Sequence, residues 1–154
     1  MNNNEILKSL RINHIFSIIA ALMVITVFET GVVAKDTLGN MLSETWTYVL
    51  QVSAVMITVL FIPLAIKGFT TSLNKALGCS DEDFIKLFIK KSVQRIFLPF
   101  IVLLLNIFVY YGIGYNGSLY CGLFALGTLF YSYPTKMVLN EYIEKNRQAR
   151  EGKK

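Results

Sequence analysis

The stretch "IFLPFIVLLLNIFVYYGIGY", residues 96–115, decides the fold class of this chain because it contains no Asp, Glu, Lys or Arg. A helix needs about 20 predominantly apolar residues to cross the hydrocarbon core of a bilayer, which is roughly 30 Å thick. The stretch therefore predicts a membrane-spanning helix. The residues that follow it, Asn116, Gly117 and Ser118, are typical of turns, so we expect the next apolar run to return antiparallel to this one.

Three further apolar runs of similar length, at about residues 12–34, 46–66 and 118–138, accompany this stretch. The composition agrees with them, since 54% of the 154 residues are hydrophobic and only 16% are charged. No remaining segment is long enough for a separate soluble core. We therefore expect an all-α integral membrane protein, with residues 1–154 forming a single domain built on a bundle of four transmembrane helices.

The basic residues indicate the orientation of this bundle. Lys35 alone falls on one side of the predicted spans, and the other 14 of the 15 basic residues fall on the opposite side. Short loops rich in Lys and Arg stay in the cytoplasm. We therefore expect an inner (plasma) membrane protein with both termini cytoplasmic and a cytoplasmic tail over residues 139–154.

The longest predicted loop, residues 67–95, carries an amphipathic pattern. Gly78 indicates a helix end and Ser80 a new N-cap, and three acidic residues follow in the first turn. Beyond them, apolar residues such as Phe84 and Phe88 alternate with lysines at helical spacing. We expect a cytoplasmic helix that lies in the plane of the membrane interface between the second and third spans. Its expected contacts with anionic lipid headgroups are Lys86, Lys90, Lys91 and Arg95.

Polar side chains inside the predicted spans are few. An ionisable or strongly polar side chain in a span marks a functional site or a polar helix contact. Glu29 lies in the outer part of the first span, so it could either take part in helix packing at the interface or belong to a transport or binding site. The candidates for a ligand or ion path are Glu29, Gln51, Asn106 and Tyr110.

Small residues recur at helical spacing on the fourth predicted span. Such residues let neighbouring helices approach closely and exchange hydrogen bonds. The predicted helix-packing residues are Cys121, Ala125, Thr128 and Ser132. Prolines also lie near the cytoplasmic ends of the last three spans, where they either end helices or mark a cavity. These prolines are Pro63, Pro99 and Pro134.

The reactive side chains do not form a recognisable catalytic set. His14 is the only histidine, and the two cysteines, Cys79 and Cys121, fall in different environments. We therefore expect no metal site, no cofactor and no catalytic residue. The net charge of +5 reflects the side of the membrane on which basic residues gather, so we expect no nucleic-acid partner.

These patterns favour a non-enzymatic accessory or interaction protein, of the subunit or immunity type, that acts by helix packing in the membrane. Its expected partners are anionic lipid headgroups at the cytoplasmic face and either a second copy of the chain or another membrane protein. The alternative is a small transporter or channel that uses Glu29, Gln51 and Asn106 along a polar path. A lipid-modifying enzyme, with polar groups around Lys67, Arg95 and Lys136, is the third and least favoured interpretation.

Overall fold

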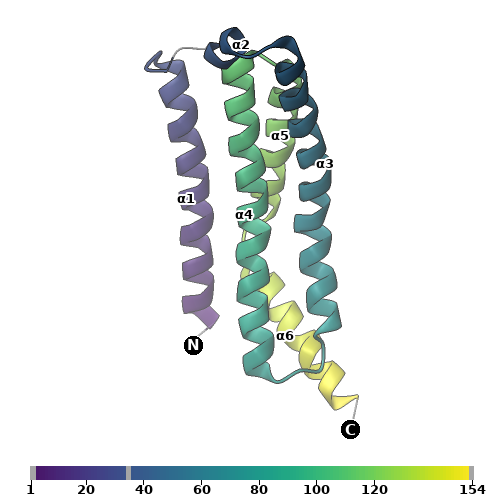
Figure 1. Ribbon diagram of the computed structural model, residues 1–154. Helices are drawn as coiled ribbons and strands as arrows, with labels where there is room; N and C mark the ends of the chain where they lie inside the picture. The colour runs from purple at the N-terminus through teal and green to yellow at the C-terminus, as the bar shows by residue number, and fades with distance from the viewer. Residues whose placement is uncertain (1–2, 34–35, 153–154) are drawn as a thin grey trace.

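The computed structural model describes residues 3–33 and 36–152, and every regular element in these ranges is an α-helix (Figure 1). Three of the helices are long and apolar enough to cross a membrane. The predicted all-helical fold with membrane-spanning segments is thus confirmed, and the described residues contain three helices of spanning length where we expected four. The helices are α1 (Asn3–Glu29), α2 (Thr37–Met41), α3 (Glu44–Lys75), α4 (Asp81–Ile113), α5 (Asn116–Tyr131) and α6 (Lys136–Glu151).

Helix α1 begins well before the predicted start of the first span. Its early residues Ile6, Leu7 and Leu10 are buried in a core formed with α3, α4 and α6, which stabilises helical turns that hydropathy alone does not predict. The helix ends at Glu29, because Gly31 takes a left-handed conformation with φ of 74°. Ala34 and Lys35, the predicted end of the span and its outer basic residue, lie outside the described residues.

The prediction of a separate interfacial helix within residues 67–95 is wrong. Helix α3 continues to Lys75, and α4 runs without interruption from Asp81 to Ile113. The apolar face of the amphipathic segment packs against protein, since Phe69 and Tyr142 surround Phe88 with ring centroids 5.7 and 6.3 Å away. The predicted cap is correct, because Ser80 accepts a hydrogen bond from the Asp83 N–H at the start of α4.

The fourth predicted span, residues 118–138, is also not one helix. Helix α5 ends at Tyr131, four residues without helical structure follow, and α6 begins at Lys136 with Thr135 as its N-cap. Pro134 lies in this break, where it cannot continue a helix. In contrast, Pro63 and Pro99 lie inside α3 and α4. The expected tail over 139–154 is largely the α6 helix, which buries Leu139 and other residues against the bundle.

The α4–α5 connection is a tight hairpin, as the sequence predicts, but the predicted turn residues Asn116, Gly117 and Ser118 form the first turn of α5. Gly114 ends α4 in a left-handed conformation with φ of 65°, and Tyr115 is the N-cap of α5. A Cβ atom at position 114 would lie 2.8 Å from Oδ1 of Asp36, so the site requires glycine for both its conformation and its space.

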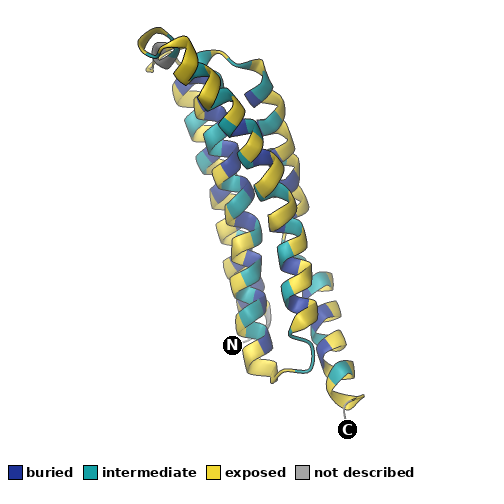
Figure 2. Cartoon of the chain, turned by 45° about the vertical axis from the view of Figure 1, so that its right-hand side comes forward, coloured by how far each residue is buried: buried dark blue, intermediate teal, exposed yellow. Residues whose placement is uncertain are grey.

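Two apolar clusters lie at different heights along α4, which is the central helix of the bundle (Figure 1). Figure 2 shows buried residues along the length of the bundle. The lower cluster joins α1, α3, α4 and α6 and consists of Ile6, Leu7, Leu10, Phe69, Leu73, Phe84, Phe88, Leu139 and Tyr142. The upper cluster joins α1, α4 and α5 and consists of Ala21, Phe28, Ile96, Val102, Leu103, Ile107, Tyr111, Ala125 and Leu129.

Both ends of the chain lie at the same end of the bundle, together with the α3–α4 loop and α6 (Figure 1). The opposite end carries α2 and the α4–α5 hairpin. The described basic residues on α6 and on the first turns of α4 therefore gather at the end that holds the termini.

Candidate functional site at the break between α5 and α6

The break over residues 132–135 leaves backbone carbonyls that are captured by side chains from two other helices. Leu129 O accepts from Nε2 of His14 at 2.8 Å, and Tyr131 O accepts from Nη2 of Arg95 at 3.0 Å. Pro134 O accepts from Nε of Arg11 at 3.3 Å. Carbonyls at a helix C-terminus have no partner within the helix, and irregular backbone at membrane depth must be satisfied by protein. The three bonds therefore stabilise the break.

His14 is buried at this site, with only 2% of its surface exposed. Because its Nε2 bonds to a carbonyl, that nitrogen must carry a proton. Nδ1 is buried and has no hydrogen-bond partner among the described residues. The ring packs edge-on against Tyr133 at 5.3 Å between centroids. His14 thus fixes the last turn of α5 against α1.

Arg95 lies between α3 and α5. Its guanidinium carbon is 4.8 Å from the ring centroid of Phe69 and 5.0 Å from that of Tyr131. Such stacking is favourable for a guanidinium, as is its place at a helix C-terminus, where the helix dipole is negative. Among the residues that the structure describes, no carboxylate lies within ion-pair distance of Arg95. The site therefore holds a cation that is stacked and hydrogen-bonded but not neutralised.

The depth of the break follows from the helices that contact it. Arg11 precedes Glu29 by 18 residues on α1, and Arg95 precedes Ile113 by 18 residues on α4. Each interval corresponds to about 27 Å of helix, close to the roughly 30 Å thickness of a hydrocarbon core. Helix α5 itself, with 16 residues, is about 24 Å long. The break thus lies nearly one bilayer thickness from the opposite end of the bundle.

Two of the path candidates, Asn106 and Tyr110, line the same cavity, whereas Glu29 and Gln51 are not among its lining residues. Asn106 is fully buried and donates from Nδ2 to Thr58 Oγ1 at 2.9 Å and to Val102 O at 2.8 Å. Its Oδ1 is buried and has no partner within the described part of the chain. Gln51 is half-buried on α3, seven residues from Thr58. The structure therefore joins Asn106 to Thr58 in a contact between α3 and α4.

Glu29 lies at the exposed end of α1 and accepts a hydrogen bond of 2.6 Å from the Tyr111 hydroxyl on α4. The Tyr111 ring stacks on Phe28 with centroids 4.7 Å apart. Tyr110 is half-buried and contacts Tyr111 edge-on. This contact ties α1 to α4 at the end opposite the termini.

The predicted packing residues on α5 and in the break face the bundle to different extents. Ala125, Thr128 and Ser132 are buried, whereas Cys121 is half-buried. The hydroxyls of Thr128 and Ser132 donate to carbonyls four residues earlier, at 2.9 and 2.8 Å. They therefore satisfy the backbone of their own helix turn, as hydroxyls in membrane helices commonly do.

The predicted headgroup contacts separate into two groups. Lys86 and Lys90 are exposed, and Lys91 is half-buried with its Nζ 3.1 Å from Oε1 of Gln94. Arg95, in contrast, points into the protein at the break. The four residues lie along one continuous helix, α4, and not on a separate helix before it.

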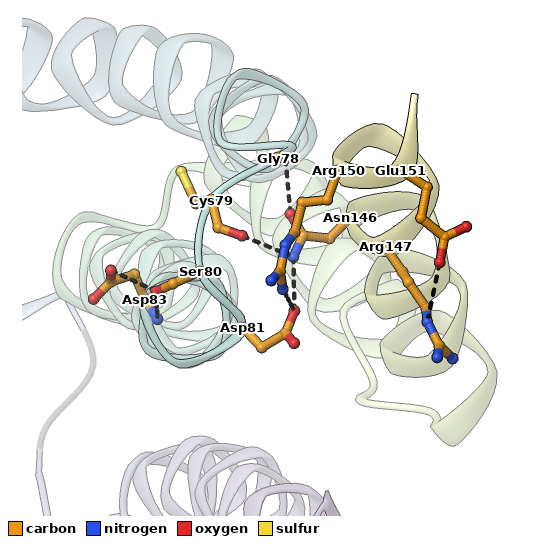
Figure 3. Close-up of polar contacts among 9 residues, drawn as sticks. All are labelled: Gly78, Cys79, Ser80, Asp81, Asp83, Asn146, Arg147, Arg150 and Glu151. Carbon is orange, nitrogen blue, oxygen red and sulfur yellow. Dashed lines mark hydrogen bonds and ion pairs between the residues drawn. The ribbon is translucent and has the colours of Figure 1, made fainter. Parts of the chain in front are cut away.

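A polar cluster that the sequence did not reveal joins α6 to the α3–α4 loop (Figure 3). Asn146 is 1% exposed, accepts from the Gly78 N–H at 2.8 Å, and donates to Cys79 O and Asp81 Oδ1, both at 3.3 Å. Arg150 pairs with the same Asp81 oxygen at 2.7 Å. Asn146 is the centre of this cluster. It lies in a charged segment, and no local sequence pattern distinguishes it from its exposed neighbours.

The described residues contain no group of three or more His, Cys, Asp or Glu side chains that could hold a metal ion. Comparisons with models of protein families, with curated proteins and with solved structures returned no match. What the chain does must therefore be inferred from its own geometry.

Proposed function

We propose that this protein is a non-enzymatic, four-span membrane protein that acts by packing its helices against other membrane components. One observation carries this proposal. Only 17% of the most apolar 18-residue window of α3 is buried in the bundle, compared with 50% for α4. Most of that window on α3 is thus exposed or only half-buried, and α1 is similar, with 22% of its window buried. Spanning helices in this arrangement are available to neighbouring proteins.

In this proposal α5 is the fourth span. It is shorter than an average span, and the break completes the crossing because its carbonyls are satisfied by Arg11, His14 and Arg95. The end that holds the termini is then cytoplasmic, as the distribution of Lys and Arg favours, in the inner membrane. The partner is a membrane protein or a second copy of the chain.

The experiment is site-specific photo-crosslinking in the native membrane. A photoreactive residue at Leu60, which is 60% exposed on α3, should give a discrete crosslinked protein band. The control position is Phe97, which is 55% exposed on α4. Lipid adducts alone at Leu60, together with a monomer in native-lipid particles, would overturn the proposal.

A transporter is the second candidate, and one observation favours it. A cavity of about 110 Å³ between α1, α4 and α5 is lined by Asn106 and by Tyr111, whose hydroxyl contacts Glu29. Oδ1 of Asn106 has no hydrogen-bond partner among the described residues. A coupled carrier would use Glu29 as its titrating group. Unchanged flux in proteoliposomes that carry Glu29→Gln, at every pH, would exclude this role.

A further inference from the structure

A groove of about 630 Å³ runs along the outside of the bundle between α3 and α5. Its walls are almost entirely apolar and rich in aromatic rings. From Tyr120 to Tyr131 the groove follows eleven residues of α5, or about 16 Å, which is close to the roughly 15 Å depth of one leaflet. Its lining includes Ile66 of α3 and Tyr120, Phe124, Gly127, Thr128 and Tyr131 of α5.

One end of the groove lies next to a positive charge. The guanidinium carbon of Arg95 is 5.0 Å from the ring centroid of Tyr131, which lines the groove, and 4.8 Å from that of Phe69 on α3. Arg95 donates to one backbone carbonyl and, as described above, has no carboxylate partner within the described residues. Lys67, the residue after Ile66, is exposed near the same end. An apolar slot that ends next to an unneutralised cation is complementary to an amphiphile with an apolar tail and an anionic head.

We propose that the α3–α5 groove binds one acyl chain of an anionic phospholipid whose phosphate lies at Arg95. The planar fork of the guanidinium suits bidentate contact with phosphate oxygens. Nε of Arg95 is buried and Nη2 already donates to Tyr131 O, so the edge formed by Nη1 and Nη2 is the one that remains for phosphate. With the orientation proposed above, this site faces the inner leaflet. The site itself does not depend on that orientation. Of the four basic residues expected to contact lipid headgroups, the proposal thus keeps Arg95, which lies at a helix break.

The test is native mass spectrometry of the full chain, released from nanodiscs with equal amounts of phosphatidylglycerol and phosphatidylethanolamine of the same acyl chains. The wild type should retain one phosphatidylglycerol in preference to phosphatidylethanolamine by about five-fold, as expected for one basic residue at the surface. Arg95→Gln should lose this preference.

A second variant leaves Arg95 and the helix break unchanged, so its result does not depend on whether Arg95→Gln disturbs the fold. An added Cβ at Gly127 has no heavy atom within 4 Å, so Gly127→Leu fills the groove without a clash at that atom. This variant should lose the retained lipid. The matched control is Gly68→Leu, on α3, where an added Cβ also meets nothing within 4 Å. It should behave as the wild type.

Three outcomes would overturn the proposal. Equal retention of the two lipids by the wild type would show that Arg95 does not select an anionic headgroup. Equal lipid retention by Gly127→Leu and Gly68→Leu would show that the groove is not the site. A lipid-free dimer that Gly127→Leu dissociates would assign the groove to a second copy of the chain. None of these outcomes depends on whether α3 crosslinks to a partner at Leu60, so the two proposals fail separately.

Discussion

The lower and upper clusters show two ways of holding helices together in one molecule. The lower cluster packs large side chains such as Phe84, Phe88 and Tyr142, and α6 covers it beside a hydrogen-bonded loop. The upper cluster includes small residues such as Ala21 and Ala125 and is crossed by the Asn106–Thr58 hydrogen bond. In water the hydrophobic effect drives the first kind of packing. In lipid that driving force is absent, so close contact and hydrogen bonds remain.

The largest expected effect comes from Phe88→Ala in the lower cluster. Phe88 is 3% exposed, and its truncation leaves a cavity among Phe69, Tyr142 and their neighbours. The free energy of unfolding should fall by about 3–5 kcal/mol, measured by steric trapping in bicelles. The control is Phe97→Ala on the same helix, 55% exposed, which should change it by no more than about 0.5 kcal/mol. An equal fall in the free energy of unfolding in the two variants would show that the lower cluster is not a hydrophobic core of the kind found in water-soluble proteins.

The second-largest effect is expected for Asn146→Ala, which should loosen α6 from the α3–α4 loop. This change leaves the Gly78 N–H without its partner and should cost about 1–3 kcal/mol. Amide hydrogen exchange should quicken in the α3–α4 loop and in α6, while the upper half of α4 stays protected. Asn140→Ala, an exposed asparagine on the same helix, is the control. Unchanged exchange in the loop would contradict the proposed docking of α6 by Asn146.

A smaller effect is expected in the upper half. A double-mutant cycle of Asn106→Leu with Thr58→Val should give a coupling free energy of about 0.6 kcal/mol, the average for hydrogen bonds between membrane helices. Thr58 keeps its own bond to Ala54 O, which limits the loss. A coupling above about 3 kcal/mol would mean that the upper half depends on polar contacts as strongly as the lower end depends on its core.

The smallest effect concerns the exposed pair of Lys145 and Glu141 on α6, 2.6 Å apart. The hydrogen bond and the charge of Glu141 raise the pKa of Lys145 above its ordinary value. A raised pKa stabilises the fold below the ordinary pKa of lysine, and this contribution is lost as the pH rises through the folded value. Glu141→Gln should lower the pKa of Lys145 in an NMR titration with no measurable change in unfolding. If the pKa of Lys145 were the same in Glu141→Gln as in the wild type, the two side chains would not be paired in solution.

The sequence predicted the helical class, a hairpin after the span 96–115 and the cap at Ser80, because hydropathy and turn residues are local signals. The turn itself lies at Gly114 and Tyr115, just before the residues expected to form it. It did not predict that α4 is one straight helix, since an amphipathic face has the same pattern whether it meets lipid or protein. Phe69 and Tyr142, which cover that face, come from distant positions.

The site at the break was missed for a related reason. Pro134 is a possible helix end, but the apolar residues that continue to Val138 favour one longer span in the sequence. The side chains that stabilise the break, Arg11, His14 and Arg95, lie on other helices, and no spacing in the sequence relates them to it. Pro134 between Ser132 and Thr135 was the one local signal that could have located it.

The most direct test of this division into two halves is the depth of spin labels along α5 and α6 in nanodiscs, measured after Cys79 and Cys121 are replaced by serine. Labels at Phe124 and Phe130, which are exposed on α5, should be relaxed by oxygen and protected from a water-soluble nickel complex. Labels at Asn140 and Glu144 on α6 should show the reverse, with the change falling at residues 132–135. Oxygen accessibility that continues through Met137 and Asn140 would instead show a single uninterrupted span and contradict the division.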